Sequence, residues 1–258
     1  MTAPSALGAR HPEVDRLRRL LRRRSERASE RAFVVEGPKP VAEALAAGAP
    51  IEAIYLADGA VFDAAVGDVP VRVLQPGVLE RVADTVTPQP VLAVCRAIDV
   101  GLDAIATATF VVVCVDVQDP GNAGTILRSA EASGAGAVVF TGASVDPFNP
   151  KAVRASAGSL FHVPVVSGGE AVDVLEQLGR QGLHRLGTVA RTGALLDETD
   201  LTRRVALVLG NEAHGLPSDV YACLDGHVTI PMVGRSESLN VGMAAAVLCF
   251  EVARQRRG

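Results

Sequence analysis

Short apolar runs alternate with segments of helical periodicity along most of the chain. Beyond about residue 110, β-branched apolar runs predict five strands, at 110–117, 137–140, 185–190, 205–210 and 228–232. Helical periodicity predicts helices between and after them, at about 122–133, 150–160, 169–181, 216–224 and 239–255. Strands that alternate with helices form a parallel sheet covered by helices on both faces, so we expect an α/β fold here.

A shorter series of the same kind comes first. Apolar runs predict strands at 33–37, 51–57, 70–75 and 91–98, and helices at 40–47 and 76–84. We therefore predict a small α/β domain at 1–98, a linker at 99–109 and a larger domain at 110–258.

The first predicted helix, at about 10–30, is apolar on one face and rich in arginine on the others. Pro12 suits its first turn, and its apolar face carries Val14, Leu17, Leu20 and Leu21. Residues 10–31 hold nine arginines and four acids, a net charge of +5 in a chain whose total is −4. Guanidinium groups fork onto phosphate oxygens, so this pattern favours nucleic-acid binding, although a solvated basic helix without a ligand would show it too. The predicted phosphate contacts are Arg18, Arg19, Arg22 and Arg23.

Composition narrows the class of protein. Apolar residues make up 48% of the chain and there is no Trp, which suits a core of Val, Leu, Ile and Ala. No apolar run is long enough to span a membrane, and the N-terminus lacks the apolar stretch of a secretion signal. The four cysteines, at 95, 114, 223 and 249, lack the spacing of metal ligands. We expect a soluble, cytoplasmic protein with reduced cysteines and no metal site.

Three loops that follow predicted strands carry unusual residues, and such loops form the working edge of a parallel sheet. They lie within 117–135, 205–217 and 228–251. Taken singly, each has an ordinary explanation: Asp119 and Ser238 can cap helices, and Gly210 can form a turn, although it would also let a ligand approach the backbone. These explanations do not account for Arg128, and a single arginine on a helix is usually solvated.

Taken together, the three loops resemble those of one family in order, spacing and content: the SpoU (TrmH-like) RNA 2′-O-methyltransferases of the SPOUT superfamily. The matching residues are 119–124 with Arg128, 209–212 with Gly215 and Leu216, and 230–232 with 238–241. The resemblance covers roughly 109–256, and it departs from the family pattern at Ala213, His214 and Gly242. Residues 33–97 are similar, more weakly, to the family's small ribosomal-protein-like domain for RNA recognition.

The resemblance implies a parallel sheet with a C-terminal trefoil knot, S-adenosylmethionine as the methyl donor, and a homodimer with the active site near the subunit interface. The donor would lie in the knot, against apolar walls and backbone groups. The residues that the resemblance assigns to the donor are Leu209, Gly210, Asn211, Ile230, Met232 and Leu239, with Thr141 and Gly142 at the edge.

The resemblance also assigns the chemistry. Arg128 corresponds to the family's catalytic arginine. It would orient the ribose 2′-hydroxyl while it holds the neighbouring phosphate, and either that phosphate or Arg128 would accept the proton. The residues that would position the arginine, the ribose and the donor are Asn122, Glu212, Ser238 and Asn240. Lys151 and Arg154 lie in the region that faces RNA in the family.

The resulting hypothesis is an enzyme that methylates a ribose 2′-hydroxyl of 23S ribosomal RNA. The small N-terminal domain favours ribosomal over transfer RNA, because short relatives that modify transfer RNA often lack it. Transfer RNA is the alternative substrate, and an RNA-binding protein on an inactive scaffold is the alternative class, although no motif residue is missing. The variant at 211–214 is similar to relatives with a role in antibiotic resistance. A dinucleotide-binding or P-loop enzyme is disfavoured, since neither glycine pattern is present.

Overall fold

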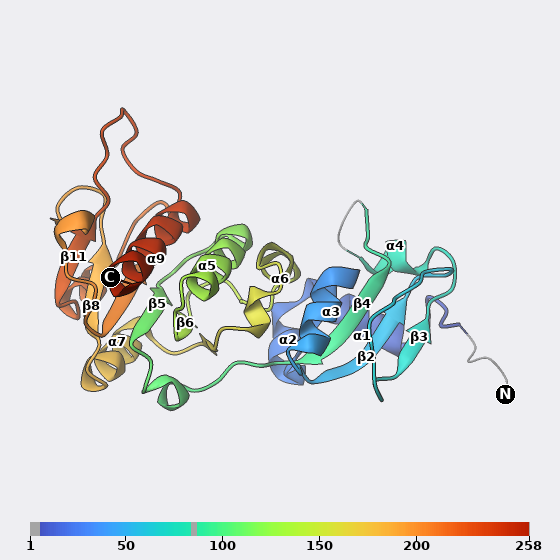
Figure 1. The fold of residues 1–258 in the computed structure, drawn as a ribbon. Coiled ribbons are helices and arrows are strands. Elements are labelled where there is room, and N and C mark those ends of the chain that lie inside the picture. The colour runs from blue at the N-terminus through green and yellow to red at the C-terminus, as the bar shows by residue number, and fades with distance from the viewer. Residues whose placement is uncertain (1–5, 84–86, 258) are drawn as a thin grey trace. The chain divides into compact units, whose positions relative to one another are not determined.

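The computed structural model describes residues 6–83 and 87–257, and the chain forms two compact units (Figure 1). The first unit contains the chain up to Ile98 together with Phe148–Phe161. The second contains Asp99–Pro147 and the chain from His162 onward. Each unit has a sheet of its own.

A four-stranded sheet forms the first unit, in the order β1-β4-β2-β3. Its strands are β1 (Ala32–Glu36), β2 (Ile51–Leu56), β3 (Val71–Val73) and β4 (Val91–Arg96). The strand β4 is antiparallel to β1 and β2, whereas β2 and β3 are parallel. The helices before β4 are α1 (Pro12–Arg22), α2 (Arg24–Glu30), α3 (Pro38–Ala46) and α4 (Val78–Val82). The predicted elements are present with bounds that differ by a few residues, and Asp84, at the end of the helix predicted over 76–84, lies outside the described residues.

The arginine-rich helix predicted at 10–30 is in fact two helices. Arg23 lies between α1 and α2 with extended backbone angles (φ −121°, ψ 117°), so the helix is broken there. The apolar face of α1 is buried as expected. It shares a core with the sheet, whose members include Val14, Leu17, Leu20, Leu21, Val34, Tyr55, Leu92 and Val94. An isolated helix of 11 residues is marginal in water, so this burial is what stabilises α1.

The segment Phe148–Phe161 packs in the first unit, whereas the sequence predicts it as part of the C-terminal domain. It contains α6 (Pro150–Ala155) and a short 3-10 helix, η2 (Ser159–Phe161). Phe33 of β1 stacks on Phe148 and Phe161, with ring centroids 4.7 and 6.4 Å apart. Arg154 donates to the Glu36 carboxylate at 2.5 Å. The boundary predicted at 110–258 therefore needs this correction, because aromatic and charged contacts join the segment to the N-terminal sheet.

A seven-stranded sheet forms the second unit, in the order β7-β6-β5-β10-β8-β11-β9. All pairings between its described strands are parallel. The strands are β5 (Phe110–Cys114), β6 (Ala137–Phe140), β7 (Val165–Ser167), β8 (His184–Thr188), β9 (Ala194–Leu195), β10 (Val205–Leu209) and β11 (Gly226–Thr229). The five predicted strands are present, and the predicted parallel α/β sheet is confirmed. The short strands β7 and β9 were not predicted.

Helices cover both faces of this sheet. One face packs against α7 (Ala171–Arg180), α8 (Ser218–Ala222) and the 3-10 helix η1 (Leu102–Ile105). On the other face, α5 (Pro120–Ala132) and α9 (Val241–Arg257) lie side by side (Figure 1). A third 3-10 helix, η3 (Leu196–Glu198), follows β9. The residues predicted as a linker, 99–109, contain η1, whose buried Ile105 belongs to this core.

The order of the central strands determines where the loops with the motifs lie. The strands β5, β10, β8 and β11 are neighbours that run in the same direction. Their loops therefore start at one edge, after Cys114, Leu209, Thr188 and Thr229 respectively. Ligands bind at this edge in parallel α/β sheets. Within 6–83 and 87–257, no helix is both long and apolar enough to cross a membrane.

Removing the Arg154 side chain should destabilise the protein. The Glu36 side chain is only 2% exposed, so Arg154→Ala would remove a guanidinium that is paired with a buried carboxylate. Loss of one partner of a buried ion pair costs about 3–5 kcal/mol, and the partial exposure of Arg154 favours the lower end. We expect the free energy of unfolding, measured by denaturant titration, to fall by about 3 kcal/mol. Lys151→Ala, in the same helix, is the control, and equal stability of the two variants would contradict the expectation.

Candidate active site

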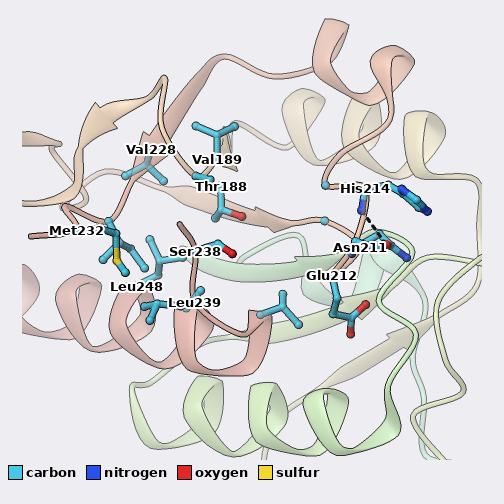
Figure 2. Close-up of a pocket in the computed structure, with 17 residues that line it drawn as sticks. Thr188, Val189, Asn211, Glu212, His214, Val228, Met232, Ser238, Leu239 and Leu248 are labelled. Atoms are coloured by element: carbon cyan, nitrogen blue, oxygen red, sulfur yellow. Dashed lines mark hydrogen bonds between the residues drawn. The ribbon is translucent and has the colours of Figure 1, made fainter. Parts of the chain in front are cut away.

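A cavity of about 380 Å³ opens at the carboxyl ends of β8, β10 and β11 (Figure 2). Its walls come from the ends of these strands, from the loops after β10 and β11, and from α9. Its apolar lining includes Val189, Val228, Ile230, Met232, Leu239, Val241 and Leu248. Its polar lining includes Thr188, Asn211, Glu212, His214 and Ser238. A cavity with apolar walls and a few polar groups is typical of sites for small organic ligands.

Most residues assigned to the donor line this cavity. They are Gly210, Asn211, Ile230, Met232 and Leu239. Leu209 is the last residue of β10 and is buried beside the cavity. The structure does not bring Thr141 and Gly142 to the lining, because β6 is separated from β10 by β5 in the sheet. The Thr141 hydroxyl instead donates to the carbonyl of Cys114, at 3.3 Å.

One wall of the cavity was not predicted from the sequence. Thr188, Val189 and Ala190 line it from the end of β8, and Ala244 and Leu248 line it from α9. The strand predicted at 185–190 already ends at these residues. Only the strand order, with β8 between β10 and β11, identifies its end as part of the site, and the sequence did not predict that order.

The loop after β10 is a tight turn closed by its own backbone. Asn211 and Gly215 exchange two backbone hydrogen bonds of 2.9 Å, and Gly215 has a left-handed φ of +69°. A Cβ atom placed on Gly210 would lie 2.5 Å from the backbone carbon of Gly215. Gly210 is therefore required by the close approach of the chain itself, and it also lies in the lining of the cavity.

A carboxylate links this loop to the start of α5. Asn122 donates through Nδ2 to Glu212 Oε1 at 2.8 Å, and the backbone amides of Gln118 and Asp119 donate to the same carboxylate at 3.3 Å. Partial burial raises the pKa of Glu212, but the hydrogen bonds from Asn122 and from the backbone outweigh it and hold the pKa below its ordinary value. Glu212 is thus a carboxylate at neutral pH, and it joins the first turn of α5, which carries Asn122, to the cavity wall.

Arg128 lies on α5 and is exposed. Within the described residues, its side chain forms no hydrogen bond or ion pair. It follows Thr125 by three positions, so the two project from the same side of the helix. Thr125 packs against α9, since a Cβ atom placed on Gly242 would lie 3.2 Å from that of Thr125. Arg128 therefore lies one turn beyond a residue that contacts the start of α9, and it is exposed and does not line the cavity.

The start of α9 is capped by Asn240. Its Oδ1 accepts hydrogen bonds from the backbone amides of Gly242, at 2.9 Å, and Met243, at 3.3 Å. Ser238 lines the cavity instead of capping the helix, so the ordinary explanation for Ser238 is wrong. The close contact with Thr125 gives a physical reason for the departure from the family pattern at Gly242, because there is little room for a side chain.

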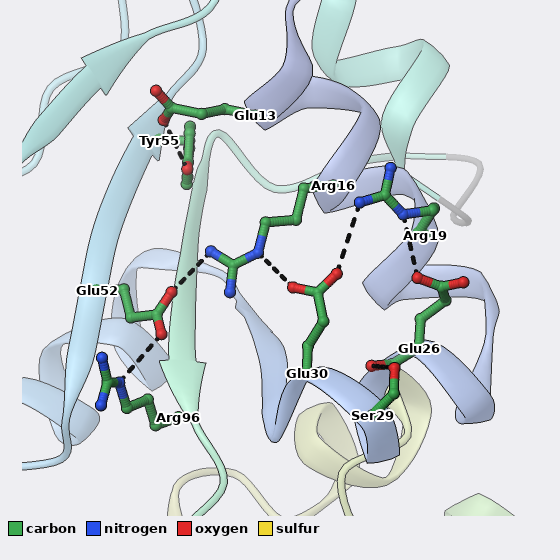
Figure 3. Close-up of polar contacts among 9 residues, drawn as sticks. All are labelled: Glu13, Arg16, Arg19, Glu26, Ser29, Glu30, Glu52, Tyr55 and Arg96. Carbon is green, nitrogen blue, oxygen red and sulfur yellow. Dashed lines mark hydrogen bonds and ion pairs between the residues drawn. The ribbon is translucent and has the colours of Figure 1, made fainter.

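Many of the N-terminal arginines form ion pairs inside their own unit (Figure 3). Arg16 contacts Glu30 and Glu52 at 2.6 and 2.7 Å, and Arg19 contacts Glu26 and Glu30 at 3.1 and 3.5 Å. The pair Arg18–Asp15 is 2.5 Å long. Of the four arginines predicted to contact phosphate, Arg22 and Arg23 are exposed and form no side-chain contact within the described residues.

The cysteines are placed as small core residues. Cys95, Cys114 and Cys249 are buried, and burial raises the pKa of the Cys95 and Cys249 thiols to about 12. These thiols are uncharged at neutral pH and are poor nucleophiles or metal ligands. Across 6–83 and 87–257, no group of His, Cys, Asp or Glu is arranged to hold a metal ion.

Comparison with known proteins identifies the family. Residues 109–250 match the SpoU rRNA Methylase family, and residues 11–93 match the MRM3-like substrate binding domain. The chain is 34% identical over 234 residues to the 23S rRNA (guanosine(2553)-2′-O)-methyltransferase RlmP of Bacillus subtilis (strain 168), covering 90% of this chain and 92% of the relative. It is 40% identical over 157 residues to the 23S rRNA (guanosine-2′-O-)-methyltransferase RlmB of Xanthomonas axonopodis pv. citri (strain 306), covering 61% of this chain and 63% of the relative.

Solved structures agree with the sequence relatives. The SpoU methyltransferase AviRb from Streptomyces viridochromogenes, in complex with AdoMet, superposes with a TM-score of 0.88 and 28% identity, covering 96% of this chain and 99% of that chain. This chain therefore belongs to the SpoU rRNA methylase family. It is an RNA methyltransferase, and the resemblance carried by the three loops is confirmed.

Substituting Gly210 should disrupt the turn that forms the cavity wall. In Gly210→Ala the new methyl group would clash with the backbone of Gly215, which cannot move as a side chain can. Overpacking of this kind costs about 1–3 kcal/mol in the free energy of unfolding. Gly234→Ala, in an open loop of the same unit with nothing within 4 Å, is the matched control. Denaturant titrations that give the two variants the same stability would rule out the close approach.

Proposed function

We propose that this protein transfers a methyl group from S-adenosylmethionine to a ribose 2′-hydroxyl in 23S ribosomal RNA, in the cytoplasm. The observation that carries the proposal is the joining of the three motif loops. The loops after β10 and β11 line one cavity, and the Asn122–Glu212 hydrogen bond ties the helix of Arg128 to its wall. The similarity to RlmP over nine-tenths of the chain supports the reaction and the substrate.

The cavity suits the methyl donor. Ile230, Met232 and Leu239 offer apolar walls for an adenine ring, and polar residues of the lining such as Thr188 and Ser238 offer hydrogen bonds. The bound donor supplies an electrophilic methyl group on a sulfonium. AviRb, which superposes over nearly the whole chain, is described with AdoMet bound, and this supports the assignment. We assign to the same region the trefoil knot of the superfamily.

Arg128 is the proposed catalytic residue. In an in-line displacement the 2′-oxygen bonds to the methyl carbon, the sulfur–carbon bond breaks, and the hydroxyl proton leaves. A guanidinium holds its proton too strongly to act as an ordinary base. Arg128 therefore clamps the adjacent phosphate and orients the hydroxyl, and the proton passes to that phosphate or to Arg128 in a perturbed state. Asn122, Glu212, Ser238 and Asn240 position the arginine, the ribose and the donor.

The N-terminal unit favours ribosomal over transfer RNA. A solved structure described as giving insights into 2-OH methylation of C/U34 on tRNA is covered over 97% of its length, yet it matches only 58% of this chain, with a TM-score of 0.53. The match of 11–93 to a substrate binding domain gives this unit a role that the shorter chain does without. Arg22 and Arg23 are the arginines best available for phosphate, with Lys151 on α6.

The protein is proposed to act as a homodimer through α9. Met243, Val247 and Phe250 are spaced along one side of this helix and are 59%, 43% and 48% exposed. Ala244 and Leu248, on another side of the same helix, line the cavity. An exposed apolar stripe of this kind is typical of a subunit interface. Its position would place the donor site near the partner subunit.

The proposed function is tested with labelled donor and unmodified ribosomal RNA. We expect label on a ribose of 23S RNA, mapped as a bond that resists alkali, and no label on transfer RNA. In Arg128→Lys the charge remains but the planar fork is lost, so the single-turnover rate should fall by about 100-fold. Arg180→Lys, an exposed arginine at the end of α7, should keep the full rate.

Each result has a distinct meaning for the proposal. Label on a base would refute 2′-O-methylation, and label on transfer RNA alone would refute the substrate. Donor binding without transfer to any cellular RNA would favour an inactive scaffold. A near-normal single-turnover rate for Arg128→Lys would refute the role of the arginine.

A charge on the apolar stripe should separate the subunits. Val247→Asp would require an unpaired carboxylate to be buried in the interface, which costs several kcal/mol. Sedimentation velocity should then show monomers where the unaltered protein is a dimer. Val61→Asp, at an equally apolar residue that is 77% exposed in the first unit, should remain dimeric. A dimeric Val247→Asp variant would exclude this side of α9 as the interface.

A further inference from the structure

Asp116 has an unusual backbone for its residue type. It lies between β5 and the turn that starts α5, and its φ is +56°, in the left-handed region. Residues with a side chain occupy this region rarely, and Asp and Asn do so more readily than others. Asp116 is not part of the motif residues that match the family loops. A strained residue next to an active site often has a function there.

The side chain of Asp116 accepts hydrogen bonds from two side-chain amides, those of Asn211 and Gln118. Asn211 donates through Nδ2 to Asp116 Oδ2 at 3.2 Å and to the Asp116 carbonyl at 3.0 Å. Gln118 donates through Nε2 to Oδ1, the other carboxylate oxygen. A carboxylate accepts at both oxygens, whereas an amide accepts at one end only. An acid at this position therefore satisfies both partners at once.

These contacts determine the orientation of the Asn211 side-chain amide, that is, which way its oxygen and its nitrogen point. With Nδ2 directed at Asp116, its Oδ1 accepts hydrogen bonds from the backbone amides of Ala213, at 2.8 Å, and His214, at 3.1 Å. Both of these residues line the cavity. Asp116 thus acts on the shape of the cavity wall through Asn211, although Asp116 itself does not line the cavity.

The link is the counterpart of the Asn122–Glu212 pair. In one pair the loop after β5 supplies the acid, Asp116, and the loop after β10 supplies the amide. In the other pair the roles are reversed, and the loop after β10 supplies Glu212. Two neighbouring residues are therefore held by the segment that follows β5: Asn211 as a hydrogen-bond donor to Asp116, and Glu212 as an acceptor from Asn122.

We propose that Asp116 is a positioning residue for the methyl donor, because it holds the turn at 210–215 in the shape that forms one wall of the cavity. The inference rests on the proposed function, in which this cavity takes S-adenosylmethionine. It predicts that loss of the carboxylate weakens donor binding in a protein that is still folded, while RNA binding by the N-terminal unit is unchanged.

The test uses the full chain and S-adenosylmethionine itself, with Kd measured by calorimetry. Asp116→Asn keeps the size and the tolerance of a left-handed backbone but can no longer accept from both partners, so Kd should rise about tenfold. Asp116→Gly relieves the backbone strain and removes the side chain, so it should fold well and yet bind the donor at least as weakly. Asp173→Asn, an exposed acid in the first turn of α7, is the control and should keep the original Kd.

A double variant tests the pairing itself. Asn211→Asp alone would bring two carboxylates together and should weaken donor binding further. Combined with Asp116→Asn, it restores a carboxylate–amide pair with the roles exchanged. The new amide can donate to position 211 and accept from Gln118, while position 211 still accepts from the amides of Ala213 and His214. We expect Kd in the double variant to fall below that of either single variant.

The outcomes separate this inference from the proposed function. If the unaltered protein binds no donor, the proposed function fails. If it binds donor, and Asp116→Asn and Asp116→Gly bind with the same Kd, the positioning role is wrong. If Kd rises only in proportion to an unfolded fraction seen by circular dichroism, or if the double variant shows no rescue, Asp116 has a structural role only and the inference is overturned.

Discussion

The parallel register that places β10 between β5 and β8 is the constraint on which the site depends. Leu209 pairs with Cys114, and Val208 pairs with Gly187, so the three strands end together. Their loops then have to share one edge, and the hydrogen bonds between the first two of these loops follow from that proximity. The strands β5 and β10 are buried along their whole length, so a shift of register would carry flanking polar residues such as Asp116 into the core and is strongly disfavoured. Packing of the core thus fixes the strand register, and the register brings together the loops that form the cavity.

Several arginines of the first unit form ion pairs with acids of the same unit. The stretch 10–31 looks like a basic surface in the sequence, but Arg16, Arg18 and Arg19 are paired with acids of their own unit. Exposed pairs of this kind contribute about 0.2–1 kcal/mol each, so they orient side chains more than they stabilise the fold. Phosphate would have to displace those acids or meet Arg22 and Arg23, which lie at the break between α1 and α2. The proposed RNA contact by this unit would therefore use fewer of the nine arginines than the sequence suggests.

The local pattern of apolar residues predicted most of the helices and strands. It failed where the position of a segment depends on contacts with residues far away in the sequence. The strand at 137–140 and the buried face of α1 follow from apolar periodicity alone. The strands β7 and β9 have three and two residues, too few to show a period. The placement of 148–161 depends on Phe33, more than 100 residues earlier, and the wall at Thr188 depends on strand order. Resemblance pointed to several residues that line the cavity, but it could not show that Gly210 is required by the close approach of Gly215.

One side of the helix α9 lines the cavity, and another side of the same helix is apolar and exposed. Ala244 and Leu248 line the cavity, whereas Met243 and Val247, each adjacent to one of them, are exposed. The start of the helix is fixed by Asn240 and by the contact of Gly242 with Thr125 on α5, the helix that carries Arg128. A rigid helix transmits a displacement along its length, so a partner that presses on the exposed side would move the cavity wall and the neighbourhood of Arg128 together. In the proposed function, donor binding and the placement of Arg128 therefore depend on the same helix, even though Arg128 does not line the cavity.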